Sequence, residues 1–165
     1  MTSPFDPSAI LRLLVRHQVR FILVGGLSGT YWGSPTVTLD LDICYERSRP
    51  NLTVLAEALR ELKATLRGAP DGLPFQLDAR TLELGDSFTF NTPFGPFDCL
   101  GTPSGTGGFA DLARNASELT VDADTRVLVC SLDDLIRMKT AAGRPKDRVE
   151  LEILAAVKEE REKLG

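Results

Sequence analysis

Two aspartates one residue apart, Asp40 and Asp42, lie in the alternating stretch TLDLDICYE (38–46). If this stretch forms a strand, alternate side chains point to the same face, so the two carboxylates share a face with their Cα atoms roughly 6.5 Å apart. Such charges repel each other unless a cation lies between them, and Mg²⁺ is held in proteins by a few carboxylates together with substrate phosphates. The pair suggests a metal site, although solvated strand faces also carry such pairs.

A third carboxylate, Asp98, lies in the apolar stretch PFGPFDCLG. A lone buried carboxylate is costly unless it is paired or bound to a metal ion, whereas at a sheet edge it would simply face water. If the strand of Asp98 pairs beside residues 38–46, the three acids converge. Three carboxylates, two metal ions and a triphosphate are the parts of a two-metal phosphoryl-transfer site.

Gly25 and Gly26 follow the apolar run RFILV (20–24) and precede residues 27–32, which their position predicts to be helical. A backbone without side chains lets phosphate oxygens approach the N–H groups, and the start of a helix adds positive potential. The hydroxyl of Ser28 offers a further donor. A phosphate cradle is one interpretation of the glycine pair, and an ordinary tight turn is the other.

The elements that must position these residues follow from apolar spacing and from turn signals. Their order is helix, strand, helix, strand, helix, then strands, then two helices. This order predicts an α/β (α+β) fold, in which a mixed β-sheet is flanked by helices and followed by a C-terminal helical pair. We expect a single domain over 1–165, with a core at about 18–130 and C-terminal helices at about 131–164.

Residue spacing also sets approximate bounds for each element. A helix begins at Asp6–Pro7, and Ser131 with Asp134 forms a capping box for a later helix that Gly143 ends. The predicted strands are roughly 20–24, 38–46, 74–78, 86–91, 95–100 and 125–130. The other predicted helices are 27–32, 49–66, 107–116, 132–142 and 146–164.

Composition limits the class of protein. The chain has 165 residues, a hydrophobic fraction of 42% and a net charge of −4. It can bury a core. An acidic chain is not a general nucleic-acid binder, although a local basic patch could still bind nucleic acid.

Cys44, Cys99 and Cys130 lack zinc-ligand spacing, so we expect reduced core residues in a cytoplasmic protein. His17 is the only histidine, and no segment is long and apolar enough to predict a membrane span.

The sequence resembles the nucleotidyltransferases of the DNA polymerase beta superfamily in three successive features: the stretch VGG after a strand, then a helix, then TLDLDI. The resemblance is strongest to the minimal bacterial kind that includes the AbiEii-like toxins. The C-terminal SLDDLIRMKTAAGRPKDRVEL resembles that group as well, with a lysine on a helix and a basic Arg-Pro-Lys-Asp stretch before the final helix. The resemblance covers residues 20–45 and 131–151 well and 95–100 weakly. It implies a metal-dependent nucleotidyltransferase.

The resemblance implies roles for the acids. Asp40 and Asp42 would bind Mg²⁺ or Mn²⁺. Asp98 would complete the metal set and act as general base on the acceptor hydroxyl. These three aspartates are the catalytic residues and metal ligands that the resemblance predicts.

The resemblance also implies a set of nucleotide-binding residues. The glycine pair and a serine would hold the phosphates, a lysine would contact the triphosphate, and the Arg-Pro-Lys-Asp stretch would line the nucleotide or acceptor side. These residues are Gly25, Gly26, Ser28, Lys139, Arg144, Lys146 and Asp147. For the two lysines, plain solvated helix charge is the alternative.

The implied reaction moves a nucleoside monophosphate from an NTP to an acceptor hydroxyl and releases pyrophosphate. RNA such as tRNA, a protein or a small molecule would be the acceptor, and a toxin–antitoxin system would supply a cognate toxin or antitoxin as partner. Two positions depart from the family pattern: Trp32-Gly33 replaces a frequent His-Gly, and Thr36 replaces a frequent arginine. They favour an alternative, a non-catalytic module of the same fold that binds a nucleotide or a partner, whereas the intact aspartates favour the enzyme.

Overall fold

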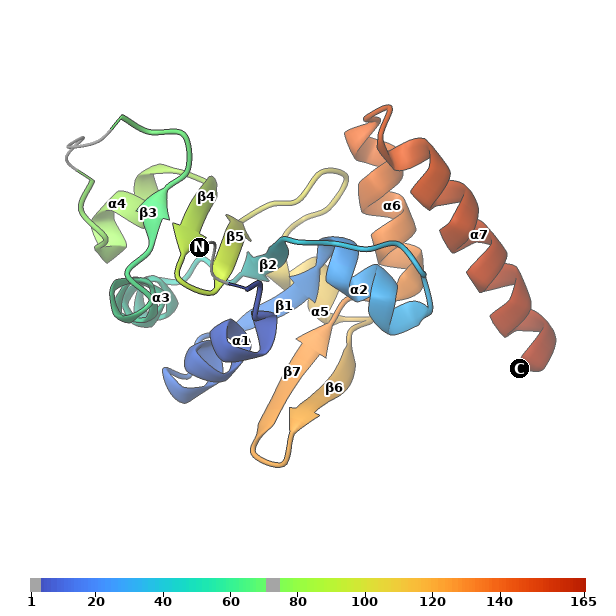
Figure 1. The fold of residues 1–165 in the computed structure, drawn as a ribbon, viewed down its shortest axis with the longest axis horizontal. Coiled ribbons are helices and arrows are strands. Elements are labelled where there is room, and N and C mark those ends of the chain that lie inside the picture. Colours follow the sequence, from blue (N-terminus) through green and yellow to red (C-terminus); the bar gives the residue numbers. More distant parts are fainter. Residues whose placement is uncertain (1–3, 71–74) are drawn as a thin grey trace.

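The computed structural model describes residues 4–70 and 75–165. In these residues a seven-stranded mixed sheet, in the order β3-β4-β5-β2-β1-β7-β6, forms the centre of the molecule (Figure 1). The strands are β1 (Phe21–Val24), β2 (Leu41–Tyr45), β3 (Thr65–Leu66), β4 (Ser87–Thr92), β5 (Gly95–Leu100), β6 (Ser117–Asp122) and β7 (Thr125–Val129). The helices are α1 (Pro7–Arg16), α2 (Gly25–Trp32), α3 (Arg49–Glu61), α4 (Ala79–Leu84), α5 (Phe109–Ala113), α6 (Leu132–Ala142) and α7 (Asp147–Leu164).

Strand pairing confirms the predicted mixed sheet. Strand β2 runs parallel to β5, and β1 runs parallel to β7, while the remaining neighbours are antiparallel. Helices flank the sheet, and α6 and α7 form the predicted C-terminal pair. The central strands β5, β2 and β1 bring the middle of the chain beside its N-terminal quarter.

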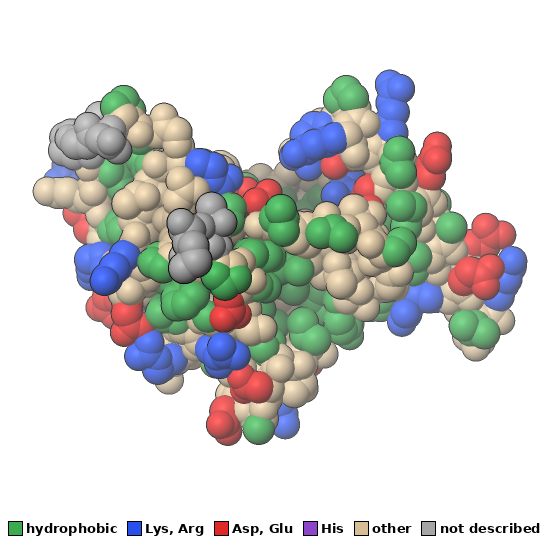
Figure 2. All heavy atoms as spheres, viewed as in Figure 1, with side chains coloured by type: hydrophobic (Ala, Val, Ile, Leu, Met, Phe, Trp, Pro, Cys, Tyr) green, Lys and Arg blue, Asp and Glu red, His purple; other side chains and the backbone are tan. Residues whose placement is uncertain are grey.

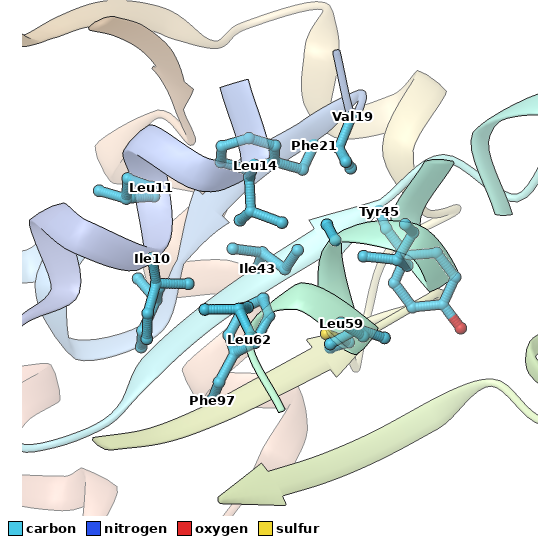
Figure 3. Packing of buried hydrophobic residues seen from close by; sticks show 14 of the residues in the cluster. Ile10, Leu11, Leu14, Val19, Phe21, Ile43, Tyr45, Leu59, Leu62 and Phe97 are labelled. Atoms are coloured by element: carbon cyan, nitrogen blue, oxygen red, sulfur yellow. The ribbon is translucent and has the colours of Figure 1, made fainter. Parts of the chain in front are cut away.

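Different helices cover the two faces of the sheet. On one face α1 and α3 pack over β2 and β5, with Ile10, Leu14, Ile43, Leu59 and Phe97 fully buried between them (Figure 3). On the other face a smaller core joins β1 and β2 to α5, α6 and α7. Burial of these apolar side chains is the main stabilising contribution to the fold.

Alternation along β2 decides which residue faces which core. Leu41, Ile43 and Tyr45 belong to the core under α1 and α3, and Cys44 belongs to the core under α6. Asp42 therefore points to the face that carries α2 and α6. The position of this aspartate in the sequence pattern thus determines the side of the sheet on which a site can form.

Local signals set where helices begin and end. The carboxylate of Asp6 accepts a hydrogen bond from the backbone N–H of Ala9 at 3.1 Å. The hydroxyl of Ser131 accepts one from the N–H of Asp134 at 3.0 Å, and Gly143, with φ +62°, ends α6. Such side chains satisfy N–H groups that have no partner within the helix. The predicted starts of α1 and α6 are confirmed.

Strand β2 is shorter than the alternation predicts. It begins at Leu41, and Leu39, which the alternation places on the same face as Leu41, is 65% exposed. The reason is that β1 ends opposite Asp42, so residues 38–40 have no partner on that side of the sheet. The prediction that Asp40 and Asp42 lie on one strand is therefore wrong for Asp40.

Other differences lie between α3 and β7. The helix predicted over 49–66 ends at Glu61, because Lys63 adopts a left-handed conformation with φ 55° and the chain continues as β3. The strand predicted over 74–78 is wrong for residues 75–78, where Asp78 caps α4 instead, and Pro74 lies outside the described residues. Helix α4 and strand β6 are not predicted from the sequence, whereas β4 and β5 form the predicted hairpin.

The three cysteines are buried and form no disulfide in the described residues, as predicted. Across the same residues, none of the helices has both the length and the apolar character that crossing a membrane requires.

Candidate active site

Asp42 and Asp98 face each other on adjacent parallel strands. Asp42 of β2 lies directly opposite Asp98 of β5 in the strand register, so the strand pairing on which the convergence of these two acids depends is present. Burial foremost, and then the charge of Asp98, a hydrogen bond to it and the charge of Asp40, raise the pKa of Asp42 to about 7, while the charge of Lys139 opposes them. When both carboxylates are ionised, their negative charges repel each other, and a bound cation would relieve this repulsion.

Gly25 makes room for this acid pair. A Cβ built on Gly25 would lie 2.1 Å from Oδ2 of Asp42, and the residue has φ +72°. Only glycine combines this backbone conformation with so close an approach. A Cβ on Gly26 would in turn meet the side chain of Thr38 at 2.7 Å. In the described residues no side chain caps α2, so the N–H groups of its first turn have no side-chain partner at the N-cap.

A cavity of about 470 Å³ opens over the acid pair. Gly25, Asp42 and Asp98 lie in its lining together with Lys139 and Arg144, and the start of β4 and the loop after β5 complete it. Figure 2 shows the hollow between the part of the molecule that carries β3 and β4 and the part that carries α6 and α7, with acidic side chains at its base and basic ones on both sides. Its volume is typical of a site for a small ligand.

Asp147 holds the two cations of the cavity. Nζ of Lys139 lies 3.5 Å from Oδ1 of Asp147, and Nε of Arg144 donates to Oδ2 at 2.7 Å. The Asp147 side chain is 5% exposed. Burial works against its charge, but the hydrogen bonds and charges of Arg144 and Lys139 hold the pKa of Asp147 below its ordinary value. Asp147 thus joins the start of α7 to Lys139 of α6, next to the two cations that line the cavity.

Five residues of the predicted site do not line the cavity: Gly26, Ser28, Asp40, Lys146 and Asp147. Ser28 is fully buried, and its hydroxyl donates to the carbonyl oxygen of Gly25 at 2.6 Å, so it supports the turn from within. Lys146 is exposed just before α7. Asp40 lies before β2, although it is near enough for its charge to raise the pKa of Asp42.

Arg67 is a residue of the site that the sequence does not single out. Its Nη2 donates to Oδ1 of Asp98 at 2.8 Å, from the segment that follows β3. The helix predicted over 49–66 places Arg67 in the loop after that helix and away from the sheet. The left-handed Lys63 ends α3 early and returns the chain to the sheet, and nothing in the local pattern signals this.

Trp32 and Thr36, the positions that depart from the family pattern, make contacts within the fold. The indole N–H of Trp32 donates to the carbonyl oxygen of Cys130 at 2.9 Å, and the Arg161 guanidinium carbon lies 4.7 Å from the centre of the ring. The hydroxyl of Thr36 donates to Glu150. These contacts tie α2 and the segment before β2 to β7 and α7, and they account for both residues without a ligand.

The donor set at the base of the cavity suits Mg²⁺. Carboxylate oxygens are the protein ligands that this cation prefers. Asp42 and Asp98 supply them, and burial together with the neighbouring acids raises the pKa of Asp42 to about 7. Over residues 4–70 and 75–165, no group of three or more His, Cys, Asp or Glu side chains is arranged to hold a metal ion. The fit therefore rests on two facing carboxylates that substrate phosphates would supplement.

Comparisons with known proteins bear on the fold. No protein-family model matches the sequence, and no curated protein sequence does. The structure is similar to the lincosamide antibiotic adenylyltransferase LnuA with lincomycin bound, at a TM-score of 0.61 and 13% identity over 94% of this chain and 99% of that one. It is also similar to ANT(2'')-Ia in complex with adenylyl-2''-tobramycin, at a TM-score of 0.56 and 17% identity over 93% of this chain and 87% of that one.

A third similar structure is TM1012 from Thermotoga maritima, described as a candidate nucleotidyltransferase. It has a TM-score of 0.55 and 14% identity over 87% of this chain and 86% of that one. At such identities the likeness shows the fold alone. The chain has the fold of nucleotidyltransferases, as predicted, whereas none of these three structures is described as a toxin.

Proposed function

We propose that the protein is a nucleotidyltransferase that moves a nucleoside monophosphate from an NTP to an acceptor hydroxyl. The observation that carries the proposal is the facing pair Asp42 and Asp98 at the base of a cavity that Lys139 and Arg144 also line. Catalysis of phosphoryl transfer is largely positioning and charge stabilisation, which such a set of fixed charges supplies. The similar fold of an adenylyltransferase supports this reading.

Each part of the cavity has a task in this proposal. The N–H groups at the start of α2, including those of Gly25 and Gly26, hold phosphate oxygens together with Lys139 and Arg144. The acceptor oxygen attacks the α-phosphorus, a new P–O bond forms, and the bond to the β-phosphate oxygen breaks, so pyrophosphate leaves. The hydroxyl proton passes to Asp98 as general base.

We propose that Asp42 and Asp98 hold Mg²⁺ or Mn²⁺, and that Asp40 contributes only its negative charge from the segment before β2. When bound, the ion would stabilise the charge of the triphosphate and orient the acceptor oxygen. The space that Gly25 leaves beside Oδ2 of Asp42 supports this assignment. Asp147 keeps the cations of the opposite wall in place through its ion pairs. Ser28 has a structural role, because its hydroxyl is already bonded to the turn.

A small hydroxyl compound is the acceptor class that we propose first. LnuA is a lincosamide adenylyltransferase, and ANT(2'')-Ia was solved with adenylyl-2''-tobramycin. In this chain, Ser87, Thr102 and Ser104 line the cavity and offer hydroxyl groups to such a compound. RNA such as tRNA, or a protein partner in a toxin–antitoxin pair, is the other class, and a transfer assay with separated fractions distinguishes them.

The second candidate function is a non-catalytic module of the same fold. The observation that favours it is Thr36, which stands where relatives often have an arginine and whose hydroxyl is bonded to Glu150. In this case a nucleotide or a protein partner binds without turnover. A folded protein that binds an NTP and transfers nothing to any acceptor fraction would establish this second candidate.

The unfolding temperature tests the metal–nucleotide site. A ligand that binds only the folded state raises this temperature. We expect a rise for the wild type with Mg²⁺ and a non-hydrolysable NTP, and none for Asp42→Asn. Asp124→Asn, in the exposed turn between β6 and β7, is the matched control and should keep the rise. A rise that survives Asp42→Asn, or no rise in the wild type with any common NTP, would contradict the proposal.

A further inference from the structure

Arg67 is fixed to the sheet beside Asp98. Its backbone N–H donates to the carbonyl oxygen of Thr89 at 2.9 Å, which extends the pairing of β3 with β4 by one residue. Nη2 donates to the carbonyl oxygen of Phe90 at 2.7 Å, and Nε donates to Oδ1 of Asn91 at 3.3 Å. The guanidinium is therefore anchored to β4 by contacts that do not involve Asp98.

The contact with Asp98 uses one carboxylate oxygen. Nη2 of Arg67 donates to Oδ1 at 2.8 Å, and the two side chains are 33% and 18% exposed. Oδ2 of Asp98 takes no part in this bond. A charged hydrogen bond from an anchored guanidinium restricts how the carboxylate can rotate.

Arg67 is placed differently from the other cations of the site. Lys139 and Arg144 line the cavity on the side of α6, whereas Arg67 is not among the lining residues. It contacts Asp98 from the side of β3 and β4. An exposed ion pair contributes little because two long side chains must be ordered. Arg67 is already ordered by β4, so its effect falls on the orientation of Asp98.

We infer that Arg67 is a positioning residue, which holds the carboxylate of Asp98 in the orientation that receives the acceptor proton. This inference rests on the proposed function, in which Asp98 is the general base. It divides the cations of the site into two groups: Lys139 and Arg144 act on phosphates, and Arg67 acts on the base.

Two substitutions at Arg67 separate positioning from charge. Arg67→Met removes every donor, and we expect kcat to fall about 100-fold with the KM for the NTP within about 3-fold, because misplacing a reacting group by about 1 Å costs this much. Arg67→Lys keeps the charge but cannot bond Asp98, Phe90 and Asn91 together, so we expect a fall of about 10-fold. Asn91→Ala removes one anchor and should lower kcat in the same sense, but less.

Arg126→Met is the matched control. Arg126 lies on β7 of the same sheet and pairs with Glu118 at 3.7 Å on the exposed surface. This variant should turn over like the wild type. The unfolding midpoint of every variant is measured alongside, so that a loss of folded protein is not mistaken for a loss of kcat.

Crystal structures without ligand give a readout that does not depend on turnover. We expect the Asp98 carboxylate to keep its orientation in the wild type, to turn partly in Arg67→Lys, and to turn fully away from it in Arg67→Met. An unchanged Asp98 in Arg67→Met overturns the inference, and so does a raised KM for the NTP at unchanged kcat. If Asp98 turns in the variant but the folded wild type transfers nothing, the proposed function fails while the positioning contact stands.

Discussion

The backbone of Gly25 lies against the carboxylate of Asp42. A Cβ built on Gly25 would lie 2.1 Å from Oδ2 of Asp42, well inside van der Waals contact. Strand β1 ends at Val24, opposite Asp42, and Gly25 begins α2 with φ +72°. The first turn of α2 and the acid pair are therefore in direct contact, so a substitution in one of them should also displace the other.

Replacing Gly25 by alanine tests this contact. The added methyl group would collide with Asp42, and alanine is strained at this positive φ. Gly68→Ala is the matched control, because Gly68 has φ +78° and no described atom lies within 4 Å of an added Cβ. We expect Gly68→Ala to lose about 1 kcal/mol through strain alone. Gly25→Ala should lose clearly more in urea denaturation and should lose the NTP-dependent rise in unfolding temperature, so equal losses would contradict the contact.

The raised pKa of Asp42 predicts a pH-dependent stability for the metal-free protein. Its pKa is about 7 in the folded state against an ordinary value of 3.8. The folded state therefore keeps a proton that the unfolded chain has released, and the resulting stability is present below the ordinary value and lost as the pH rises through about 7. With EDTA present, the free energy of unfolding of the wild type should fall between about pH 5 and about pH 8 relative to that of Asp42→Asn.

A constant difference between the wild type and Asp42→Asn over this range would show that Asp42 does not titrate there. The same competition predicts that Mg²⁺ stabilises the wild type more at about pH 8 than at about pH 6, because the cation and the proton compete for one carboxylate pair.

Asp147 predicts the opposite pH dependence. Asp147→Asn removes the charge that pairs with Lys139 and Arg144, and it should lower the free energy of unfolding by about 2 kcal/mol at neutral pH. Because the pKa of Asp147 is lowered, its contribution is present above the ordinary aspartate value and is lost as the pH falls through the folded pKa. Urea titrations should therefore show the difference from the wild type shrinking in acid.

Asp133→Asn is the control for that series. Asp133 lies on α6, is 71% exposed and pairs with Lys158. Exposed pairs of this kind contribute little to stability, so this variant should unfold like the wild type at every pH. If Asp133→Asn lowered the free energy of unfolding as much as Asp147→Asn, the ion pairs of Asp147 would have no special role in holding α6 to α7.

The acid pair and the glycine turn could be predicted because their signals are local. Asp98 stands alone among apolar residues on a strong strand, and Gly25 ends an apolar run just before a helix. Strand β6, which is absent from the predicted elements, also carries a local signal, since Leu119 and Val121 alternate with polar residues before a turn. Such elements follow from side-chain periodicity and turn residues within a short window.

Asp40 and Arg67 show what a local pattern leaves out. The alternation of 38–46 continues through Asp40, but the strand cannot begin until a neighbour is present to pair with it. The apolar spacing of α3 continues past Glu61, yet the left-handed Lys63 ends the helix and sends Arg67 along β4 to Asp98. Both outcomes depend on contacts between distant segments, which spacing within one segment does not encode.

Transfer of label from an NTP shows whether the protein is a nucleotidyltransferase and which class of acceptor it modifies. Purified protein is incubated with each α-labelled NTP, Mg²⁺ or Mn²⁺ and whole-cell extract, and the RNA, protein and small-molecule fractions are then separated. We expect label in the small-molecule fraction with the wild type and with Asp124→Asn, and no label with Asp42→Asn. Label in the RNA or protein fraction would support the proposed nucleotidyltransferase activity but would contradict the proposal that the acceptor is a small hydroxyl compound. No label with any nucleotide, from folded protein that still binds an NTP, would contradict the account and identify a non-catalytic module.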